Sequence, residues 1–308
     1  MEPLSIIAKD DPVTCAVYAK DNGLLDTPGW KQFKSLAKRQ HKFTRMINQA
    51  KLRSYNTAPK FKNGYQVPKS YADAVRLDER NGNTKWQEAI DLELKQINEY
   101  ETFTDLGHHT SAKLPQGSKK IRVHFVFDVK HDGRHKARLV ADGHLTEIPL
   151  ESVYSGVVSL RGFRLVMFMA ELNNLEFWAT DIGNAYLEAH TAEKVCIVAG
   201  PEFGALEGHI LVISKALYGL RSSGARWHDR FADCMSELKF FPCKAEPDIW
   251  MRQSENGYEY IAVYVDDLAI AMKNPKEFVD ILETQYKFKT KGTGPIKFHL
   301  GMDFFRDD

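Results

Sequence analysis

Residues 258–272 read YEYIAVYVDDLAIAM, and this stretch decides the fold. It contains the tetrapeptide Tyr264-Val265-Asp266-Asp267 between two apolar runs, at 258–263 and at 268–272. Apolar runs of this length on either side of a short polar break predict two strands joined by a tight turn. The predicted turn carries two adjacent carboxylates.

A lone aspartate, Asp181, ends another short apolar run at 177–180. Strand ends that are far apart in sequence can meet in space, and carboxylates gathered there offer oxygen ligands to a hard cation such as Mg²⁺. Asp181, Asp266 and Asp267 together have the donors to hold a pair of Mg²⁺ ions, which nucleotidyl transfer requires. Taken singly, each aspartate has a structural alternative, because Asp is favoured in turns and as a helix cap.

Composition and length set the broad class. The 308 residues are enough for one large domain or two lobes, and 43% hydrophobic with 27% charged residues is typical of globular proteins. No apolar run approaches the roughly 20 residues of a membrane helix, so no membrane association is expected. The start, Met1-Glu2-Pro3, lacks the basic and apolar regions of a secretory signal. The cysteines have no metal-ligand spacing and predict reduced intracellular thiols: Cys15, Cys196, Cys234 and Cys243.

The net charge of +1 conceals a basic segment near the N-terminus. Residues 27–72 contain no Asp or Glu but eleven lysines and arginines, interleaved with aromatic residues. Such a segment can follow a nucleic-acid backbone and stack on bases, or it can be a solvated leader without a partner. Pro59, Gly64 and Pro68 break its pattern. We expect residues 1–70 to form a poorly ordered basic leader.

The rest of the chain mixes helices and strands without strict βαβ alternation, which predicts an α+β fold. Apolar residues alternate from Ile121 to Val129, Asp132-Gly133 turns the chain, and 136–141 returns. Lys136 and Arg138 share one face of this returning strand. The other expected elements are helices at 71–80, 163–172 and 225–239, a helix opened by a capping box at 84–87, strands at 195–199 and 210–214, a hairpin through Asn256-Gly257 and a helix capped by Asn274.

An ordered series of phrases resembles the reverse transcriptase of copia-type LTR retrotransposons over roughly residues 71–304. The tetrapeptide at 264–267 is that family's YVDD, and 136–141 match its KARLVA. One tetrapeptide recurs by chance, whereas several phrases in the right order are specific. The other phrases are at 86–93, 124–133, 155–158, 181–187, 217–221 and 300–301.

The resemblance implies the fingers and palm of a right-hand polymerase, with a mixed or antiparallel palm sheet and packing helices. It implies that residues 71–308 form these fingers and palm, with a core at 102–308. The thumb and ribonuclease H regions of this family are not expected in this chain. Gly156 and Gly224 stand where the family has proline, which predicts a looser loop over the incoming nucleotide.

For the site, the resemblance implies catalytic and metal-binding roles for Asp181, Asp266 and Asp267. The expected cofactor is a pair of Mg²⁺ ions, for which Mn²⁺ can substitute. The backbone carbonyl of Ile182 is a further expected ligand, because hard cations accept carbonyl oxygens. Tyr186 is implied to be a steric gate against the ribose 2′-hydroxyl, and its structural alternative is a core aromatic residue.

The resemblance also implies nucleotide-binding residues. Lys136 and Arg138 are expected to grip the triphosphate, with an exposed polar strand face as the alternative. Tyr218, Gly219 and Arg221 are expected to line the nucleotide pocket, with a simple strand-to-helix turn as the alternative. Gly219 would permit close backbone approach.

The function implied is an RNA-directed DNA polymerase that adds dNTPs to a primer 3′-hydroxyl. Its expected partners are an RNA template, a DNA primer–template duplex, dNTPs and the rest of a Pol polyprotein. The expected location is a cytoplasmic virus-like particle, with the nucleus as the alternative. Two other functions stay open: an inactive retrotransposon-derived fragment that at most binds nucleic acid, and a Mg²⁺-dependent nuclease built on the same carboxylates.

Overall fold

The computed structural model describes residues 58–146, 153, 155–255 and 257–305, together with scattered single positions before residue 46. The chain divides into two units, Met1–Lys60 and Phe61–Asp308, and the elements discussed below lie in the second, apart from the first residue of β1, Lys60. Most of the predicted leader, 1–70, lies outside the described residues, as does Asn256 of the predicted hairpin turn. Along the described part of the chain, no helix has both the length and the apolarity needed to cross a membrane.

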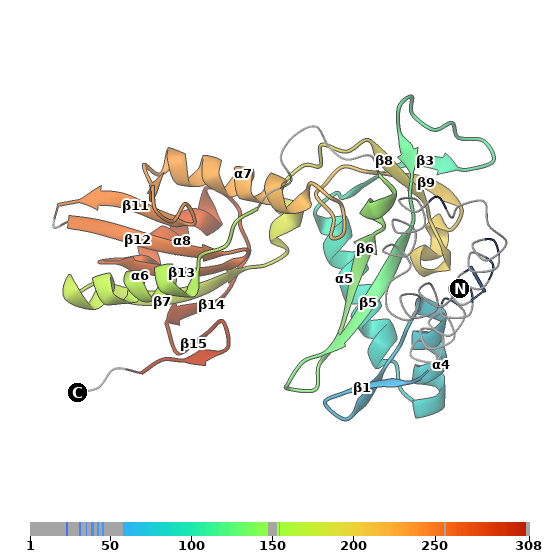
Figure 1. The fold of residues 1–308 in the computed structure, drawn as a ribbon, viewed down its shortest axis with the longest axis horizontal. Helices are drawn as coiled ribbons and strands as arrows, with labels where there is room; N and C mark the ends of the chain where they lie inside the picture. Colours follow the sequence, from blue (N-terminus) through green and yellow to red (C-terminus); the bar gives the residue numbers. More distant parts are fainter. Residues whose placement is uncertain are drawn as a thin grey trace. The chain divides into compact units, whose positions relative to one another are not determined.

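A six-stranded antiparallel sheet forms one half of the second unit (Figure 1). Its strand order is β10-β11-β12-β13-β7-β14, so β7 lies between β13 and β14 although β13 and β14 follow it in sequence. The strands are β7 Glu176–Ile182, β10 Phe241–Pro242, β11 Ile249–Ser254, β12 Gly257–Tyr264, β13 Asp267–Met272 and β14 Thr290–Pro295. The two strands predicted around the tight turn, β12 and β13, are confirmed.

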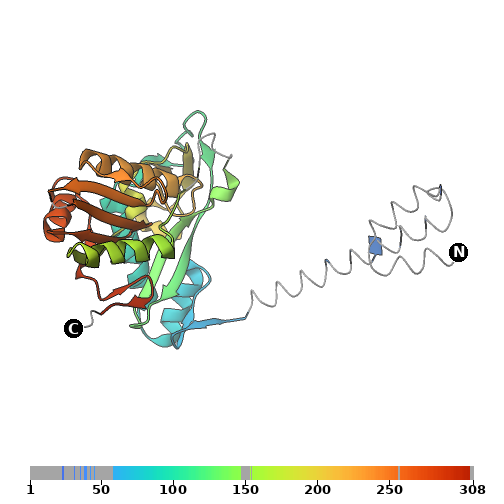
Figure 2. The same ribbon diagram turned by 60° about the vertical axis from the view of Figure 1, so that its left-hand side comes forward.

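Helices cover both faces of this sheet. Helix α6, Leu160–Leu172, crosses one face and appears yellow-green in the turned view of Figure 2. Its Phe163, Val166 and Ala170 pack on small sheet residues such as Ala269. Helices α7, Ser223–Glu237, and α8, Pro275–Thr284, pack on the other face. Each large side chain buried in this way contributes about 1.5–3 kcal/mol to folding.

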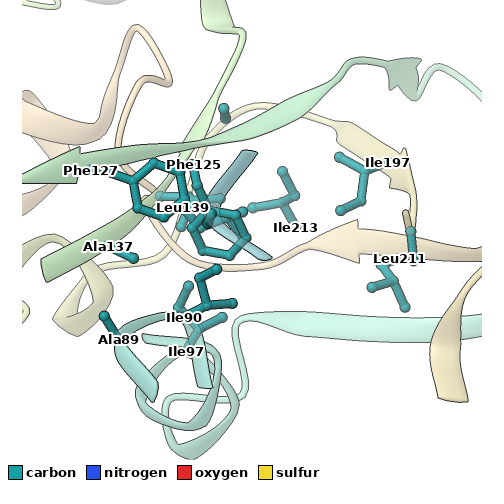
Figure 3. Packing of buried hydrophobic residues seen from close by; sticks show 14 of the residues in the cluster. Ala89, Ile90, Ile97, Phe125, Phe127, Ala137, Leu139, Ile197, Leu211 and Ile213 are labelled. Carbon is teal, nitrogen blue, oxygen red and sulfur yellow. The ribbon is translucent and has the colours of Figure 1, made fainter. Parts of the chain in front are cut away.

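The other half of the unit is built on helix α5, Lys85–Glu99, and the hairpin of β5, Val123–Val129, with β6, His135–Ala141. Figure 3 shows Ile90 and Ile97 of α5 pointing toward Phe125 and Leu139 of the hairpin. The predicted alternation is confirmed, because Ala137 and Leu139 are buried while Lys136 and Arg138 are only half-buried on the opposite face.

A four-stranded mixed sheet, ordered β3-β9-β8-β4, completes this half. Its one parallel pairing joins β4 to β8, and the combination of helices with largely antiparallel sheets confirms the α+β class. The remaining elements are β1 Lys60–Lys62, β2 Tyr65–Val67, α4 Tyr71–Asn81, β3 Phe103–His108, β4 Lys119–Lys120, β8 Val195–Val198, β9 His209–Ile213, β15 Phe298–His299, β16 Met302–Asp303 and the 3-10 helices Gly143–Leu145, Ala185–Glu188 and Pro201–Leu206.

The predicted capping box at the start of α5 is wrong. The Thr84 side chain accepts no hydrogen bond from the backbone of the first turn, and its hydroxyl donates instead to the Glu88 carboxylate at 2.6 Å. The fully buried carboxylate of Asp78, in α4, instead accepts hydrogen bonds from the backbone N–H groups of Trp86 (3.0 Å) and Gln87 (2.9 Å). Because α4 and α5 are packed against each other, the Asp78 carboxylate of α4 reaches the N-terminus of α5. It caps that helix in place of a side chain from the adjoining residues.

Two glycines, Gly143 and Gly219, allow the backbones of their two loops to pass very close to each other. Gly219 has a φ of +91°, and a Cβ there would lie 2.2 Å from the Ala141 carbonyl oxygen. A Cβ on Gly143 would lie 2.2 Å from the Gly219 carbonyl oxygen. The Ala141 N–H donates to the Tyr218 carbonyl at 2.7 Å. Only residues without a side chain permit this approach of backbone to backbone.

The substitution Gly219→Ala is therefore expected to lower the free energy of unfolding by about 2 kcal/mol or more, from strained φ and a backbone clash. Gly107→Ala is a matched control, because Gly107 has a φ of +92° with nothing within 4 Å of its added Cβ. The control should lose only about 1 kcal/mol. Equal losses in urea unfolding of the two variants would show that the loop crossing does not require a glycine.

Candidate active site

Three charged residues lie in one row across the large sheet. Asp181 of β7 pairs directly with Asp267 of β13 on one side and with Lys291 of β14 on the other. Residues directly opposite one another in antiparallel strands share a face of the sheet, so these three side chains project in the same direction. Two carboxylates opposite each other repel, and the arrangement therefore favours a nearby cation.

The tight turn after β12 places the third carboxylate beside this row. Tyr264 pairs with Asp267, so Val265 and Asp266 are the two central residues of the turn. Val265 has a φ of 59°, which is unfavourable for a β-branched residue and costs about 1–3 kcal/mol.

Two hydrogen bonds hold this strained turn from both sides. The Trp227 indole N–H donates to the Val265 carbonyl at 2.7 Å. The Ile182 N–H donates to the Asp266 carbonyl at 2.8 Å. The position of Asp266 thus depends on β7 and on an indole from α7, and this hydrogen bond gives Trp227 a role besides filling the core.

A cleft of about 590 Å³ brings carboxylates and cations together. Its carboxylate side consists of Asp181, Asp266 and Asp267, and its cationic side comes from the β5–β6 hairpin. The Arg138 guanidinium lies 5.1 Å from the centre of the Tyr218 ring, which orients it over the cleft. The other lining residues include Ala89, Leu92, Glu93, Gln96, Lys130, Arg134, His135, Lys136, Gly183, Asn184 and Lys291.

Six of the predicted site residues line this one cleft: Lys136, Arg138, Asp181, Tyr218, Asp266 and Asp267. Tyr186 is half-buried and its ring lies 4.8 Å from that of Tyr218, at the border of the cleft and of the sheet core. The side chain of Ile182 is fully buried in the same core, so only its backbone is available as a ligand.

Gly219 and Arg221 are not among the residues that line the cleft. The Arg221 guanidinium donates to the carbonyls of Gly143 (3.0 Å) and His144 (3.1 Å). Gly219 is required by the loop crossing described above. The described contacts of both residues are therefore with backbone of the neighbouring loop, and their role in nucleotide binding stays a prediction.

Burial and repulsion shift the pKa values of the carboxylates. Burial, followed by the charges of Asp266 and Asp181, raises the pKa of Asp267 to about 6. Burial and the charge of Asp266 also raise the pKa of Asp181, while the nearby charge of Lys291 opposes this shift. Burial lowers the pKa of Lys136, with the neighbouring charge of Arg138 as the second cause. Three carboxylates are thus close enough to repel one another, with Lys291 as a nearby positive charge that offsets part of this repulsion.

The carboxylates fit a magnesium site by their donor chemistry. Carboxylate and carbonyl oxygens are the ligands that Mg²⁺ prefers. Burial first, and then repulsion between the aspartates, raises the pKa of Asp181 and of Asp267, and a divalent cation would offset both effects. Within the described ranges, no three or more His, Cys, Asp or Glu side chains are grouped closely enough to hold a metal ion. Metal binding would therefore require side-chain adjustment at Asp181, Asp266 and Asp267.

Sequence reasoning assigned no site role to Lys291 or Glu93. Lys291 comes into the row only through the pairing of β14 with β7, which no local pattern indicates. Glu93 is buried on α5 and its carboxylate accepts a hydrogen bond from the Leu139 N–H at 3.0 Å. This bond fixes the strand that carries Lys136 and Arg138. An acidic residue on an otherwise apolar helix face was the available signal for Glu93.

Comparison with known proteins identifies the family. A family model described as reverse transcriptase (RNA-dependent DNA polymerase) matches residues 107–308. The match covers more than half of the chain, and the protein therefore belongs to this family of nucleic-acid polymerases.

The curated relatives are transposon polyproteins, which confirms the copia-type resemblance. The retrovirus-related Pol polyprotein from transposon TNT 1-94 of Nicotiana tabacum is 26% identical over 220 residues, which cover 68% of this chain and 17% of that protein. The transposon Ty1-MR1 Gag-Pol polyprotein of Saccharomyces cerevisiae is 29% identical over 216 residues, which cover 68% of this chain and 12% of that protein. The chain thus spans less than a fifth of either relative.

The raised pKa of Asp267 predicts a pH-dependent stability in the absence of divalent cations. A carboxyl group with a pKa of about 6 when folded and about 4 when unfolded favours the folded state at low pH, and this contribution is lost as the pH rises through 6. Asp267→Asn should therefore unfold at higher urea than the wild type at about pH 8, by about 1 kcal/mol after solvent screening, with the gap closing toward about pH 4.

Asp280→Asn is the control for this experiment, because Asp280 is an exposed carboxylate on α8 paired with Lys276 outside the cleft. It should follow the pH dependence of the wild type. A wild-type stability that changes with pH in the same way as that of Asp267→Asn would contradict the assignment of the shift to this carboxylate.

Proposed function

We propose that this protein is an RNA-directed DNA polymerase that transfers a nucleotidyl group from a dNTP to a primer 3′-hydroxyl. The observation that best supports the proposal is the direct opposition of Asp181 and Asp267, beside Asp266, in a cleft whose other side carries Lys136 and Arg138. Membership of the reverse transcriptase family supports the same reaction. In this proposal the six-stranded sheet is the palm, and α5, the β5–β6 hairpin and the four-stranded sheet are the fingers.

In the reaction, the primer 3′-hydroxyl gives up its proton to solvent and its oxygen forms a bond to the α-phosphorus. The bond from that phosphorus to the oxygen between the α- and β-phosphates breaks, and pyrophosphate leaves. Two Mg²⁺ ions, or Mn²⁺ in their place, would supply charge neutralisation when bound by Asp181, Asp266, Asp267 and the Ile182 carbonyl.

The chain's own groups position the reactants. Lys136 and Arg138 face the cleft from the β6 strand, where they can bind and orient the triphosphate. Glu93 keeps that strand in place through the Leu139 N–H. Tyr218 lies beneath the Arg138 guanidinium and beside Tyr186, so the two rings form a surface against which the sugar and base can rest.

The expected partners follow from this function. A polymerase must accept every sequence, so the protein would hold an RNA template and a DNA primer–template duplex through phosphates and shape, without base readout. The relatives are polyproteins, which supports association with the rest of a Pol polyprotein. A cytoplasmic virus-like particle is the proposed location, with the nucleus as the alternative.

Primer extension on poly(rA)·oligo(dT) with dTTP, in Mg²⁺ and in Mn²⁺, tests the proposal. The wild type should extend the primer, and Asp266→Asn should lose about a hundredfold or more of this activity, because it removes a carboxylate that would hold the Mg²⁺ ions whose charge neutralises the transition state. Asp280→Asn, outside the cleft, should extend like the wild type. A folded wild type that binds the duplex without extending it would favour the inactive-fragment alternative, and nucleotide release without dNTPs would favour the nuclease.

Tyr186 is proposed to exclude ribonucleotides by contact with the 2′ position. Tyr186→Ala should reduce the preference for dNTP over rNTP by about tenfold or more, while Tyr186→Phe, which keeps the ring, should preserve it. The measurement is the ratio of kcat/KM for the two nucleotides in single-nucleotide extension. An unchanged ratio in the alanine variant would leave Tyr186 as a core aromatic residue only.

A further inference from the structure

Helix α6 carries large apolar residues on two opposite sides, and packing on the six-stranded sheet uses only one of them (Figure 2). On the inner side, Phe163, Val166 and Ala170 are buried against the sheet. The apolar residues on the outer side have no part in that core, and the function proposed above makes no use of them.

The outer apolar residues form a continuous stripe. Leu165, Phe168 and Leu172 are 53%, 60% and 65% exposed. They are spaced three and four residues apart, so they lie in one row along the helix surface. Single exposed apolar residues are ordinary, whereas a row of large ones on one helix face is typical of a surface that binds another protein.

Two exposed residues of opposite charge lie beside this stripe. Arg164 and Glu171 are seven residues apart, which is about two helical turns, so they lie along the same edge of the stripe. The positive charge is nearer the start of the helix and the negative charge is nearer its end. Phe168 lies next to the midpoint between them.

This distribution of charge and apolar surface is complementary to itself. Two copies of α6 can pack antiparallel about a two-fold axis at Phe168. Leu165 of one copy then meets Leu172 of the other. On the adjoining edge, Arg164 of each copy lies beside Glu171 of the other. A parallel pair would instead oppose like charges, so the charges favour the antiparallel orientation and a second copy of this chain as the partner.

A cavity of about 310 Å³ opens beside Glu171 and suits the incoming arginine. Trp178 and Phe304 contribute aromatic rings to its lining, and Glu176 contributes a second carboxylate. The Trp178 indole N–H donates to the Glu176 carboxylate at 2.9 Å, which keeps that carboxylate next to the ring. The residues that line this cavity in the described part of the chain include no Lys or Arg. Arginine is the cation that both stacks on aromatic rings and pairs with carboxylates.

We propose that α6 is an interface through which two copies of this protein associate antiparallel. Phe168 packs on Phe168 at the centre, and Arg164 of each copy lies between Glu171 and the aromatic cavity of the other. The helix has 13 residues and is about 20 Å long, so the interface is small and the dimer is reversible, with a Kd on the order of 10 µM. This association goes beyond the polymerase function and does not depend on it.

The test is sedimentation velocity of the full chain without nucleic acid, over a range from about 1 to about 100 µM. Arg164→Glu and Glu171→Arg should each raise the Kd of the dimer about tenfold or more, because each substitution sets two pairs of like charges against each other. An equimolar mixture of the two variants should recover the affinity of the wild type, because each new charge then faces its opposite on the other copy.

Two controls separate this interface from other contacts. Phe168→Ser should also raise the Kd about tenfold or more, whereas Phe61→Ser, at a phenylalanine that is 67% exposed on β1, should leave it unchanged. Asp280→Arg reverses a charge on the exposed side of α8 and should likewise have no effect.

A wild type that stays monomeric over the whole range would overturn the proposal. A dimer that the charge reversals weaken but that their mixture does not restore would also overturn it, because the two residues would then not face each other across the interface. Equal weakening by Phe168→Ser and Phe61→Ser would reject α6 as the contact surface.

Discussion

The register between β7 and β13 is the constraint on which the site depends. A slip of one residue would move Asp181 or Asp267 to the opposite, fully covered face of the sheet and would expose core residues in exchange. The apolar sequence on that face, together with the Ile182–Asp266 hydrogen bond, fixes the register. Burial of apolar residues on both faces of the sheet thus provides the free energy that holds Asp181 and Asp267 together although their charges repel.

The two sides of the cleft belong to different hydrophobic cores. The carboxylates project from the sheet that α6, α7 and α8 cover, whereas Lys136 and Arg138 project from the hairpin that packs on α5. A few polar contacts join these cores next to the cleft, among them the Tyr100 hydroxyl donating to Glu188 at 2.9 Å and the Lys289–Glu99 ion pair at 2.7 Å. The three aspartates are therefore held on one side of the cleft and Lys136 and Arg138 on the other, each by its own core.

The sequence was sufficient wherever a pattern was local. Alternation predicted the β5–β6 hairpin and the strands around Val265, and the helical spacing of Trp227 and Phe231 predicted their burial. It failed where a contact depends on tertiary packing. Asp78 caps a helix to which it does not belong, and Lys291 reaches the site only through strand pairing. The roles predicted for Asp181, Asp266 and Asp267 remain predictions, although the structure brings these residues to one cleft.

The hydrogen bond from Trp227 to the turn has a practical consequence for spectroscopy. The indole N–H of Trp227 gives a single proton resonance, and this N–H donates a hydrogen bond to the carbonyl of Val265, the residue before Asp266. Any movement of the turn must lengthen, shorten or tilt that bond. The chemical shift of this single indole resonance would therefore follow the geometry of the turn that carries Asp266, in solution and without turnover.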